Sequence, residues 1–428
     1  MWAAAALVAI AGAAGAARAE ALLVIEADSG KVVYAHNAGH LWYPASVTKL
    51  MTAYVTLRAV KEGRLSLETP LTVSANAVAQ APVKMGFGVG TVVTVDNALK
   101  MLMVKSANDI AVVLAEGVAG SIEGFADQMN HYARQLGMTQ TSFVNPNGLP
   151  ADDQITSARD LGILARALIR EMPEYDYYWH LPGIRMGRMV QRNYNTLIGR
   201  YPGADGMKTG FICASGFNLV ASATRNGRRL IAVVLGAPSS AARAMKAAQL
   251  LERGFGSRNG LGWLMPSLGT VETLQPISEP PPNLRDEMCG GHRKRPASED
   301  EDEQLPAEVG PDSPYGVFLS SLRPKGKGAG LLQESNLGEP VLVFTGAKPP
   351  PPGTVQAWPR SKPEKRKAVT AAKAPGGKDA ASGKPAAAKA SMTPVPAGET
   401  APKPRPRKPA AKGAPASTPV SQQTTQAR

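Results

Sequence analysis

The sequence predicts an α/β (α+β) domain with three layers, helix/sheet/helix, followed by a C-terminal tail that is largely disordered. Two β-hairpins indicate the sheet, one over residues 22–35 and the other over residues 217–235, with helical segments between them. Strands at both ends of a domain imply one sheet assembled from its two ends, which helices then cover on both faces. Dense proline and charge past about Phe255 indicate where this domain stops.

The 428 residues divide into four predicted segments. Residues 1–19 resemble a signal peptide, because an Ala-rich apolar run too short to span a bilayer ends in small residues that suit a cleavage site. No Lys or Arg precedes that run, and a buried N-terminal helix is the alternative. The other segments are the folded domain over 20–256, an irregular Pro-rich and charged region over 257–358, and a basic Ala/Pro/Lys tail over 359–428.

The net charge of +14 lies mostly in the tail. From Arg360 to the end there are fifteen Lys and Arg against three Asp and Glu, so the folded part is close to neutral. This balance argues against a nucleic-acid-binding core and for a basic appendage. The two cysteines and five histidines show no metal-ligand spacing, so we expect neither a metal site nor a cofactor.

Turn residues and helix caps define the elements of the first half. Asp28-Ser29-Gly30 is a turn between two apolar strands, Leu22–Glu26 and Lys31–Ala35. Asp96 is expected to cap a helix over residues 97–104. The remaining predictions are helices over residues 46–60, 108–116 and 122–136 and short β-like runs over residues 71–73 and 91–95.

Similar signals define the second half. Ser157 and Asp160 favour the N-terminus of a helix that continues through Leu168. Residues 225–227 form the turn of the second hairpin, and a final helix is expected over residues 241–254. Further predictions are an isolated strand-like run over residues 341–344 and disorder beyond residue 360, where almost no large apolar residue occurs.

Ser46 and Lys49 form the motif around which the domain is organised. On a helix, residues three apart lie on one face and their side chains meet. A serine hydroxyl needs a neighbour to take its proton, and a lysine does so only where burial or a nearby cation lowers its pKa. Alone, the pair also fits an exposed lysine on an amphipathic helix.

Two further motifs follow in order, Ser-Ala-Asn at residues 106–108 and Lys-Thr-Gly at residues 208–210. Separately they fit ordinary helix capping and a strand edge with a close turn. Ser-Ala-Asn also occurs at residues 74–76, but in a loop-rich stretch, whereas Ser106 falls on a short turn between two helices and is preferred. The three motifs in this order are the signature of penicillin-recognising serine enzymes.

The stretch from about Leu22 to Phe255 resembles the D-alanyl-D-alanine carboxypeptidases, the low-molecular-mass penicillin-binding proteins. The similarity extends to the segments at residues 145–149, 157–160 and 216–220. The resemblance implies a β-lactamase-like serine peptidase domain over residues 20–256. It also implies a role in peptidoglycan maturation and cell shape, in the periplasm or cell envelope.

The resemblance implies that Ser46 attacks the terminal D-Ala-D-Ala bond of a peptidoglycan stem peptide and forms an acyl-enzyme. Lys49 is then the base, and Ser106 and Asn108 relay protons and hold the peptide. Water releases the shortened peptide. β-Lactams mimic D-Ala-D-Ala and are expected to act as inhibitors.

The resemblance also implies a substrate-binding set. Lys208 would supply positive charge, Thr209 would hydrogen-bond the terminal carboxylate, and the backbone N–H groups of Ser46 and Phe211 would form an oxyanion hole. Phe211 departs from the family, which often has a polar residue there. Arg243 matches a position that supports carboxylate recognition, with a plain helix-surface charge as the alternative. The expected substrate-binding residues are Lys208, Thr209, Gly210, Phe211 and Arg243.

Three other functions compete with the carboxypeptidase. A D,D-endopeptidase that cuts peptide crosslinks would use the same chemistry on another substrate. A β-lactamase would need a carboxylate for rapid deacylation, and Asp160 is the only loop-end acid of that kind. A catalytically silent wall-binding protein would function through its basic tail.

Cys213 and Cys289 either form a disulfide that ties the region after the domain to the third motif or remain two free thiols. The basic tail is either a cationic tether to an anionic wall polymer or membrane surface, or a solubilising linker with no partner. Many family members have an amphipathic C-terminal membrane anchor, whereas residues 417–428 of this sequence have no apolar face.

Overall fold

The computed structural model describes residues 20–256, 268–291, 293, 297–299, 331–332, 338–351 and 354–358. The signal peptide expected over residues 1–19 and the tail expected over residues 359–428 lie outside the described residues. Within the described ranges, no helix combines the length and the apolar character needed to cross a bilayer.

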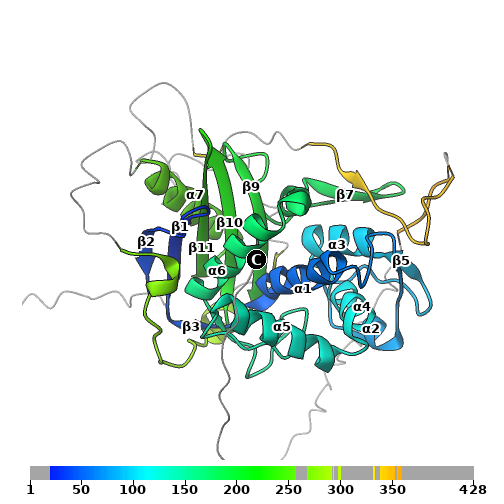
Figure 1. The fold of residues 1–428 in the computed structure, drawn as a ribbon, viewed down its shortest axis with the longest axis horizontal. Coiled ribbons are helices and arrows are strands. Elements are labelled where there is room, and N and C mark those ends of the chain that lie inside the picture. The colour runs from blue at the N-terminus through cyan, green and yellow to red at the C-terminus, as the bar shows by residue number, and fades with distance from the viewer. Residues whose placement is uncertain are drawn as a thin grey trace, which may run out of the picture. The chain divides into compact units, whose positions relative to one another are not determined.

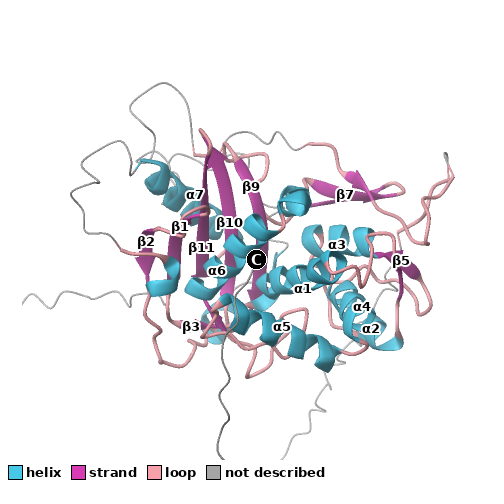
Figure 2. Ribbon diagram, in the orientation of Figure 1, coloured by secondary structure: helices cyan, strands magenta, loops and turns pink. Residues whose placement is uncertain are grey.

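A five-stranded antiparallel sheet joins the two ends of the domain, as the sequence predicts (Figures 1 and 2). Its order is β2-β1-β11-β10-β9, so strand β1 pairs with β11, and Leu23 lies opposite Val233. The strands are β1 Ala21–Glu26, β2 Val32–His36, β9 Ala204–Ile212, β10 Gly216–Arg225 and β11 Arg228–Ala237. Strand β9 is an edge strand, which leaves its second edge for other contacts.

Two helices cover opposite faces of this sheet. Helix α6 (Ala158–Glu171) and helix α7 (Ser240–Gly256) both pack on strands β1 and β11. Gly162 of α6 approaches Leu23 and Ile25, whereas Gly254 of α7 approaches Val24. Because successive residues of a strand point to opposite faces, the two helices lie on different sides. The three predicted layers are therefore present.

The segment between strands β2 and β9 contains a second, mainly helical part. Helix α1 lies at its centre, where ten of its thirteen residues are buried, so neighbours enclose it on nearly all sides. Helices α3, α4, α5 and α6 all contact it. The helices are α1 Lys49–Lys61, α2 Ala75–Ala79, α3 Val95–Val104, α4 Asn108–Ala119 and α5 Ile122–Leu136.

Short elements complete the described chain. They are β3 Leu41–Trp42, a 3-10 turn Ala45–Thr48, β4 Pro70–Thr72, β5 Val92–Thr94, β6 Thr156–Ser157, a 3-10 helix Pro173–His180, β7 Gly183–Met186, β8 Met189–Arg192, a 3-10 turn Val271–Thr273, α8 Arg285–Cys289 and β12 Val341–Leu342.

Two sequence predictions were wrong. Thr94, not Asp96, caps helix α3: Thr94 is extended and its hydroxyl accepts from the Asn97 N–H, while Asp96 already lies in the first turn and pairs with Lys100. Strand β12 is not isolated, because Val341 pairs in parallel with Ile184 of strand β7. A strand with no strand-like neighbour in the sequence can pair with a strand more than 150 residues away, and the local sequence pattern does not reveal that pairing.

Candidate active site

The 3-10 turn before helix α1 brings Ser46 to the amino group of Lys49. The distance from Nζ to the Ser46 Oγ is 2.9 Å, as the spacing of three residues predicts. Lys49 is fully buried, so the alternative of an exposed surface lysine is wrong. Gly148 packs closely against this turn, and a side chain does not fit there because a Cβ would lie 1.8 Å from the Ala45 carbonyl oxygen.

Lys49 has two further partners, both of them oxygen atoms. Its Nζ lies 2.8 Å from the Asn108 Oδ1 and 2.6 Å from the Asn147 carbonyl oxygen. The Asn108 amide nitrogen donates to the carbonyls of Ala81 and Pro82, which holds its oxygen toward Lys49. A neutral amine has two N–H groups, which these two acceptors satisfy, and one lone pair, which is left for the Ser46 hydroxyl.

The surroundings of Lys49 favour that neutral form. Burial lowers its pKa well below the ordinary lysine value, and the positive charge of Lys208 lowers it further. The negative charges of Glu299 and Asp109 act in the opposite direction but do not reverse the shift. An amine that is neutral near physiological pH can accept a proton from Ser46.

The second motif lies on the turn between helices α3 and α4. Ser106 is buried with a left-handed φ of 60°, and Asn108 begins α4. Ala107 is the N-cap and no side chain caps the helix, so capping is not the role of Ser106 or Asn108. Ser74 is different: its hydroxyl caps helix α2 by accepting from the Ala77 N–H. The structure therefore places Asn108, the third residue of the preferred motif, beside Lys49.

The third motif lies on edge strand β9, which contacts the Ser46 turn along its free side. Gly210 is the point of closest approach, since a Cβ there would lie 2.8 Å from the backbone nitrogens of Ser46 and Val47. Lys208 and Thr209 are buried, and the Lys208 Nζ donates to the Thr209 carbonyl at 3.1 Å. Burial lowers the pKa of Lys208 to about 8.

Phe211 follows Gly210 on strand β9, and Arg243 lies near the start of helix α7. The Phe211 ring packs on Phe217, with centroids 4.4 Å apart. Arg243 is only 1% exposed and therefore is not a helix-surface charge. Its guanidinium lies 5.6 Å from the Phe217 ring centroid and 3.3 Å from both carboxylate oxygens of Glu299.

Sequence reasoning missed three contributors to this arrangement. The Asn147 carbonyl binds Lys49, and the Asn218 amide donates to the carbonyls of Tyr43 and Pro44, just before Ser46. Both residues belong to segments similar to the carboxypeptidases, so resemblance singled out the segments but not the contacts. Glu299 stands in an acidic run, and that pattern does not indicate a buried ion pair.

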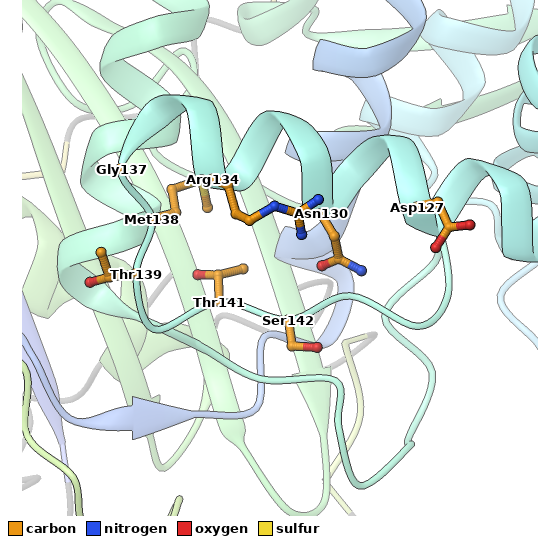
Figure 3. Close-up of a pocket in the computed structure, with 8 residues that line it drawn as sticks. All are labelled: Asp127, Asn130, Arg134, Gly137, Met138, Thr139, Thr141 and Ser142. Carbon is orange, nitrogen blue, oxygen red and sulfur yellow. The ribbon is translucent and has the colours of Figure 1, made fainter. Parts of the chain in front are cut away.

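A hollow of about 550 Å³ lies away from these groups. It is lined by Asp127, Asn130 and Arg134 of helix α5 and by residues 137–139, 141 and 142 of the loop that follows (Figure 3). None of the three motifs contributes to its lining, and no serine–lysine pair faces it. Within the described residues, no group of three or more His, Cys, Asp or Glu side chains could hold a metal ion.

An antiparallel sheet with helices on both faces, together with a buried lysine hydrogen-bonded to the serine three residues before it, is the arrangement expected of the penicillin-recognising serine enzymes. The chain belongs to the D-alanyl-D-alanine carboxypeptidase family, whose sequence profile matches residues 8–239. The helix/sheet/helix fold expected for this domain is confirmed by the five-stranded sheet and by helices α6 and α7 on its two faces.

Curated proteins and solved structures agree with this placement. The chain is 40% identical over 245 residues to D-alanyl-D-alanine carboxypeptidase DacC of Escherichia coli, which covers 55% of this chain and 61% of that protein. It is 35% identical over 266 residues to DacA of Haemophilus influenzae, covering 61% and 66%. The chain thus spans less than two thirds of the length of these relatives.

Solved structures of similar proteins share the fold. Penicillin binding protein 5 from Haemophilus influenzae superposes with a TM-score of 0.53 at 34% identity, covering 55% of this chain and 70% of that one. The D-alanyl-D-alanine carboxypeptidase DacD from Francisella tularensis also gives a TM-score of 0.53, at 32% identity, covering 54% and 69%.

Proposed function

We propose that this chain is a serine-type D-Ala-D-Ala carboxypeptidase that removes the terminal D-alanine from peptidoglycan pentapeptides, in wall maturation and cell-shape control. The observation that carries the proposal is the buried Lys49 amine, 2.9 Å from the Ser46 hydroxyl. Its two other hydrogen-bond partners, Asn108 and Asn147, are acceptors in the positions that a neutral base requires.

In the proposed reaction, the Ser46 oxygen attacks the carbonyl carbon of the D-Ala-D-Ala bond while Lys49 takes the hydroxyl proton. The negative charge that develops on the carbonyl oxygen is stabilised by the backbone N–H groups of Ser46 and Phe211. The close approach of Gly210 to the Ser46 turn supports this pairing of donors. The proton passes to the leaving D-Ala amine through the Ser106 and Asn108 turn.

Water then attacks the acyl-enzyme, with Lys49 again as the base, and the shortened peptide leaves with a new carboxylate. The terminal carboxylate of the substrate would be bound by Lys208, Thr209 and Arg243. Two buried cations and a hydroxyl make a site for one anion, because charge-assisted hydrogen bonds are the strongest available. β-Lactams, which carry a comparable carboxylate, would acylate Ser46 in the same position.

The surroundings of Asp160 argue against a β-lactamase. One carboxylate oxygen binds Arg159, and the other accepts from the Gln140 N–H and the Thr141 hydroxyl. Asp160 is fully buried in the first turn of helix α6, so it has a structural role and is poorly placed to activate a deacylating water. The intact Ser46–Lys49 pair likewise argues against a catalytically silent wall-binding protein.

Digestion of purified muropeptides tests the proposal and separates it from the D,D-endopeptidase alternative. We expect the enzyme to release one D-alanine from each pentapeptide and to leave crosslinked dimers intact. Loss of crosslinks would establish the endopeptidase instead. Unchanged muropeptides from an enzyme that binds penicillin would contradict both activities.

The pH dependence of kcat/KM should be bell-shaped. The rate should rise as Lys49 loses its proton, because only the neutral amine can accept from Ser46. It should fall again near pH 8, because Lys208, with its pKa of about 8, loses the charge that attracts the substrate carboxylate. Lys49 and Lys208 interact, so the apparent pKa values of the two limbs describe the pair rather than either lysine alone.

The variant Lys208→Arg separates the two limbs of that profile. Its guanidinium stays charged throughout this range, so the fall near pH 8 should disappear while the rising limb remains. The check is kcat/KM on a small soluble D-Ala-D-Ala peptide at intervals across this range. A descending limb unchanged in Lys208→Arg would show that Lys208 does not cause it.

We propose that the protein is exported through residues 1–19 to the periplasm or cell envelope, as the signal-like sequence predicts. The Cys213–Cys289 disulfide supports export, because disulfides persist in oxidising compartments. The N-terminal sequence of the mature protein decides this, and a start at Glu20 is expected. An unprocessed N-terminus on the cellular protein would overturn it.

The basic segment from residue 360 is proposed as a cationic tether to an anionic wall polymer or membrane surface. Its fifteen Lys and Arg support the idea, although a solubilising linker has the same composition. A chain ending at Pro359 should retain activity on a soluble peptide but sediment less with isolated sacculi or anionic vesicles at low salt, where charges are screened least. Equal sedimentation of both chains at low and high salt would exclude the tether.

A further inference from the structure

A carboxylate from the chain itself lies at the carboxylate-binding end of the proposed site. Both Glu299 carboxylate oxygens are 3.3 Å from Nη1 of Arg243. The Arg243 side chain is 1% exposed and the Glu299 side chain 14% exposed, so this ion pair is shielded from water. Arg243 also approaches the carbonyls of Asn218 and Tyr194, which hold its guanidinium in place.

The charge of Glu299 also reaches the two lysines of the site. It raises the pKa of Lys49 and of Lys208, acting against the burial that lowers both. A carboxylate that interacts with Arg243, Lys208 and Lys49 together stands where the carboxylate of a bound peptide would interact with the same cations. Glu299 is the first residue of the acidic run 299–303.

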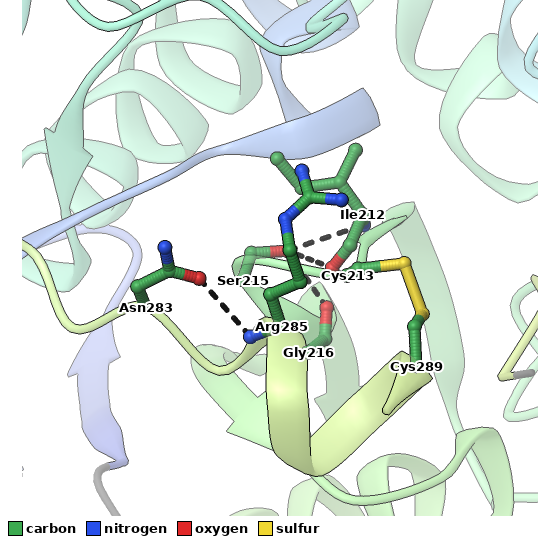
Figure 4. Close-up of a disulfide and its surroundings, with 7 residues drawn as sticks. All are labelled: Ile212, Cys213, Ser215, Gly216, Asn283, Arg285 and Cys289. Atoms are coloured by element: carbon green, nitrogen blue, oxygen red, sulfur yellow. Dashed lines mark hydrogen bonds between the residues drawn. A yellow bond between two sulfur atoms is a disulfide. The ribbon is translucent and has the colours of Figure 1, made fainter. Parts of the chain in front are cut away.

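A strap, residues 284–291 and 297–299, holds Glu299 near this position. A disulfide joins Cys289 of the strap to Cys213, three residues after Gly210 of the third motif (Figure 4). The strap is further fixed by a hydrogen bond from the Leu284 N–H to the Ala214 carbonyl, 2.9 Å, and by the buried side chain of Met288.

The part of the strap that carries Glu299 folds back on this anchor. The Ala297 N–H donates to the Met288 carbonyl at 3.3 Å, and Ala297 is buried. Glu299 follows Cys289 by only ten positions in the sequence. A ligand on so short a tether has an effective concentration on the order of millimolar, so even a weak carboxylate–arginine contact is populated.

We propose that Glu299 is a built-in competitor that occupies the place of the substrate's terminal carboxylate and must leave before a D-Ala-D-Ala peptide binds. The proposal rests on the carboxypeptidase function argued above. A peptide whose carboxylate reaches Arg243 and Lys208 displaces the strap, whereas a peptide lacking that carboxylate gains nothing from doing so. Occupation of the carboxylate site by Glu299 therefore makes the enzyme more selective for peptides with a free C-terminal carboxylate.

The competitor should raise the apparent KM without affecting the chemical step. If Glu299 occupies the site in about nine tenths of the molecules, the apparent affinity for substrate is reduced about tenfold. Glu299→Gln removes the negative charge with little change of shape, so KM for diacetyl-Lys-D-Ala-D-Ala should fall about tenfold at unchanged kcat. The matched control is Asp286→Asn, which removes an exposed charge from the same strap and should leave KM unchanged.

A second substrate and a second variant keep the test independent of one substitution. The same peptide with an amidated C-terminus should gain nothing from Glu299→Gln, because it has no carboxylate to compete. Reduction of the disulfide in folded wild type by dithiothreitol loosens the tether and should lower KM in the same direction. Cys213→Ser/Cys289→Ser, with Glu299 retained, should behave like the reduced protein.

Each outcome distinguishes this proposal from the proposed function. A wild type that releases D-alanine but has the same KM as Glu299→Gln, within twofold, overturns the competitor and leaves the carboxypeptidase intact. An equal decrease in KM for the free and the amidated peptide in Glu299→Gln would overturn the idea that Glu299 mimics the substrate carboxylate. A wild type and a Glu299→Gln variant that both fail to release D-alanine or to bind fluorescent penicillin overturn the proposed function, and the competitor with it.

Discussion

Replacing Ser46 by alanine should abolish labelling of the protein by fluorescent penicillin. In the proposed reaction the acyl bond forms on the Ser46 oxygen, so removal of that oxygen leaves no atom to be acylated. The measurement is the fluorescence of the protein band on a denaturing gel after incubation with the labelled antibiotic. We expect D-alanine release to disappear in the same variant.

Ser74→Ala is the matched control for this experiment, because Ser74 begins the other Ser-Ala-Asn pattern of the chain. Its hydroxyl caps helix α2, so the variant should lose about 1 kcal/mol of stability and should label like wild type. Equal labelling of Ser46→Ala and wild type would refute the assignment of the nucleophile, whatever the result for Ser74.

Replacing Lys49 by alanine should slow penicillin acylation by about 10²–10⁴-fold, the usual contribution of a general base. Ser46 would remain in place but would lose the one side chain that, among the described residues, lies within hydrogen-bond distance of its hydroxyl. The measurement is the rate of acylation followed over time at saturating antibiotic. Lys49→Met, which fills nearly the same volume, should show a loss of similar size and tests for an effect of the cavity.

Lys61→Ala provides the control on the same helix. Lys61 is an exposed residue of helix α1 that pairs with Glu174, so its removal tests for a general effect of losing a lysine from this helix. It should acylate at the wild-type rate. A Lys49→Ala variant as fast as Lys61→Ala would mean that another group activates Ser46.

The structure supports both expectations through contacts that lie far apart in the sequence. Lys49 and the Asn147 carbonyl are 98 residues apart, and Lys49 and Asn108 are 59 residues apart. A substitution at either asparagine should therefore act through the position and protonation of Lys49. The disulfide, one of two alternatives for Cys213 and Cys289, forms in the structure and adds a covalent contact across 76 residues.

The elements and motifs of this protein could be read from the sequence because they obey local rules. Apolar runs and turn residues placed the two hairpins, and the helix over residues 122–136 has the bounds that its amphipathic pattern predicts. A spacing of three residues on a helical turn brought Ser46 and Lys49 together. The one misplaced cap, Asp96 for Thr94, concerned two residue types that both cap well.

Only the tertiary structure decided which of these groups become reactive and what surrounds them. The sequence does not reveal whether a given lysine is buried, and burial is what lowers the pKa of Lys49 and of Lys208. The pairing of strand β12 with β7 and the placement of Glu299 against Arg243 join segments that have no local signal for each other. Desolvation and ion pairing act through space, so they become definite only when distant segments have packed together.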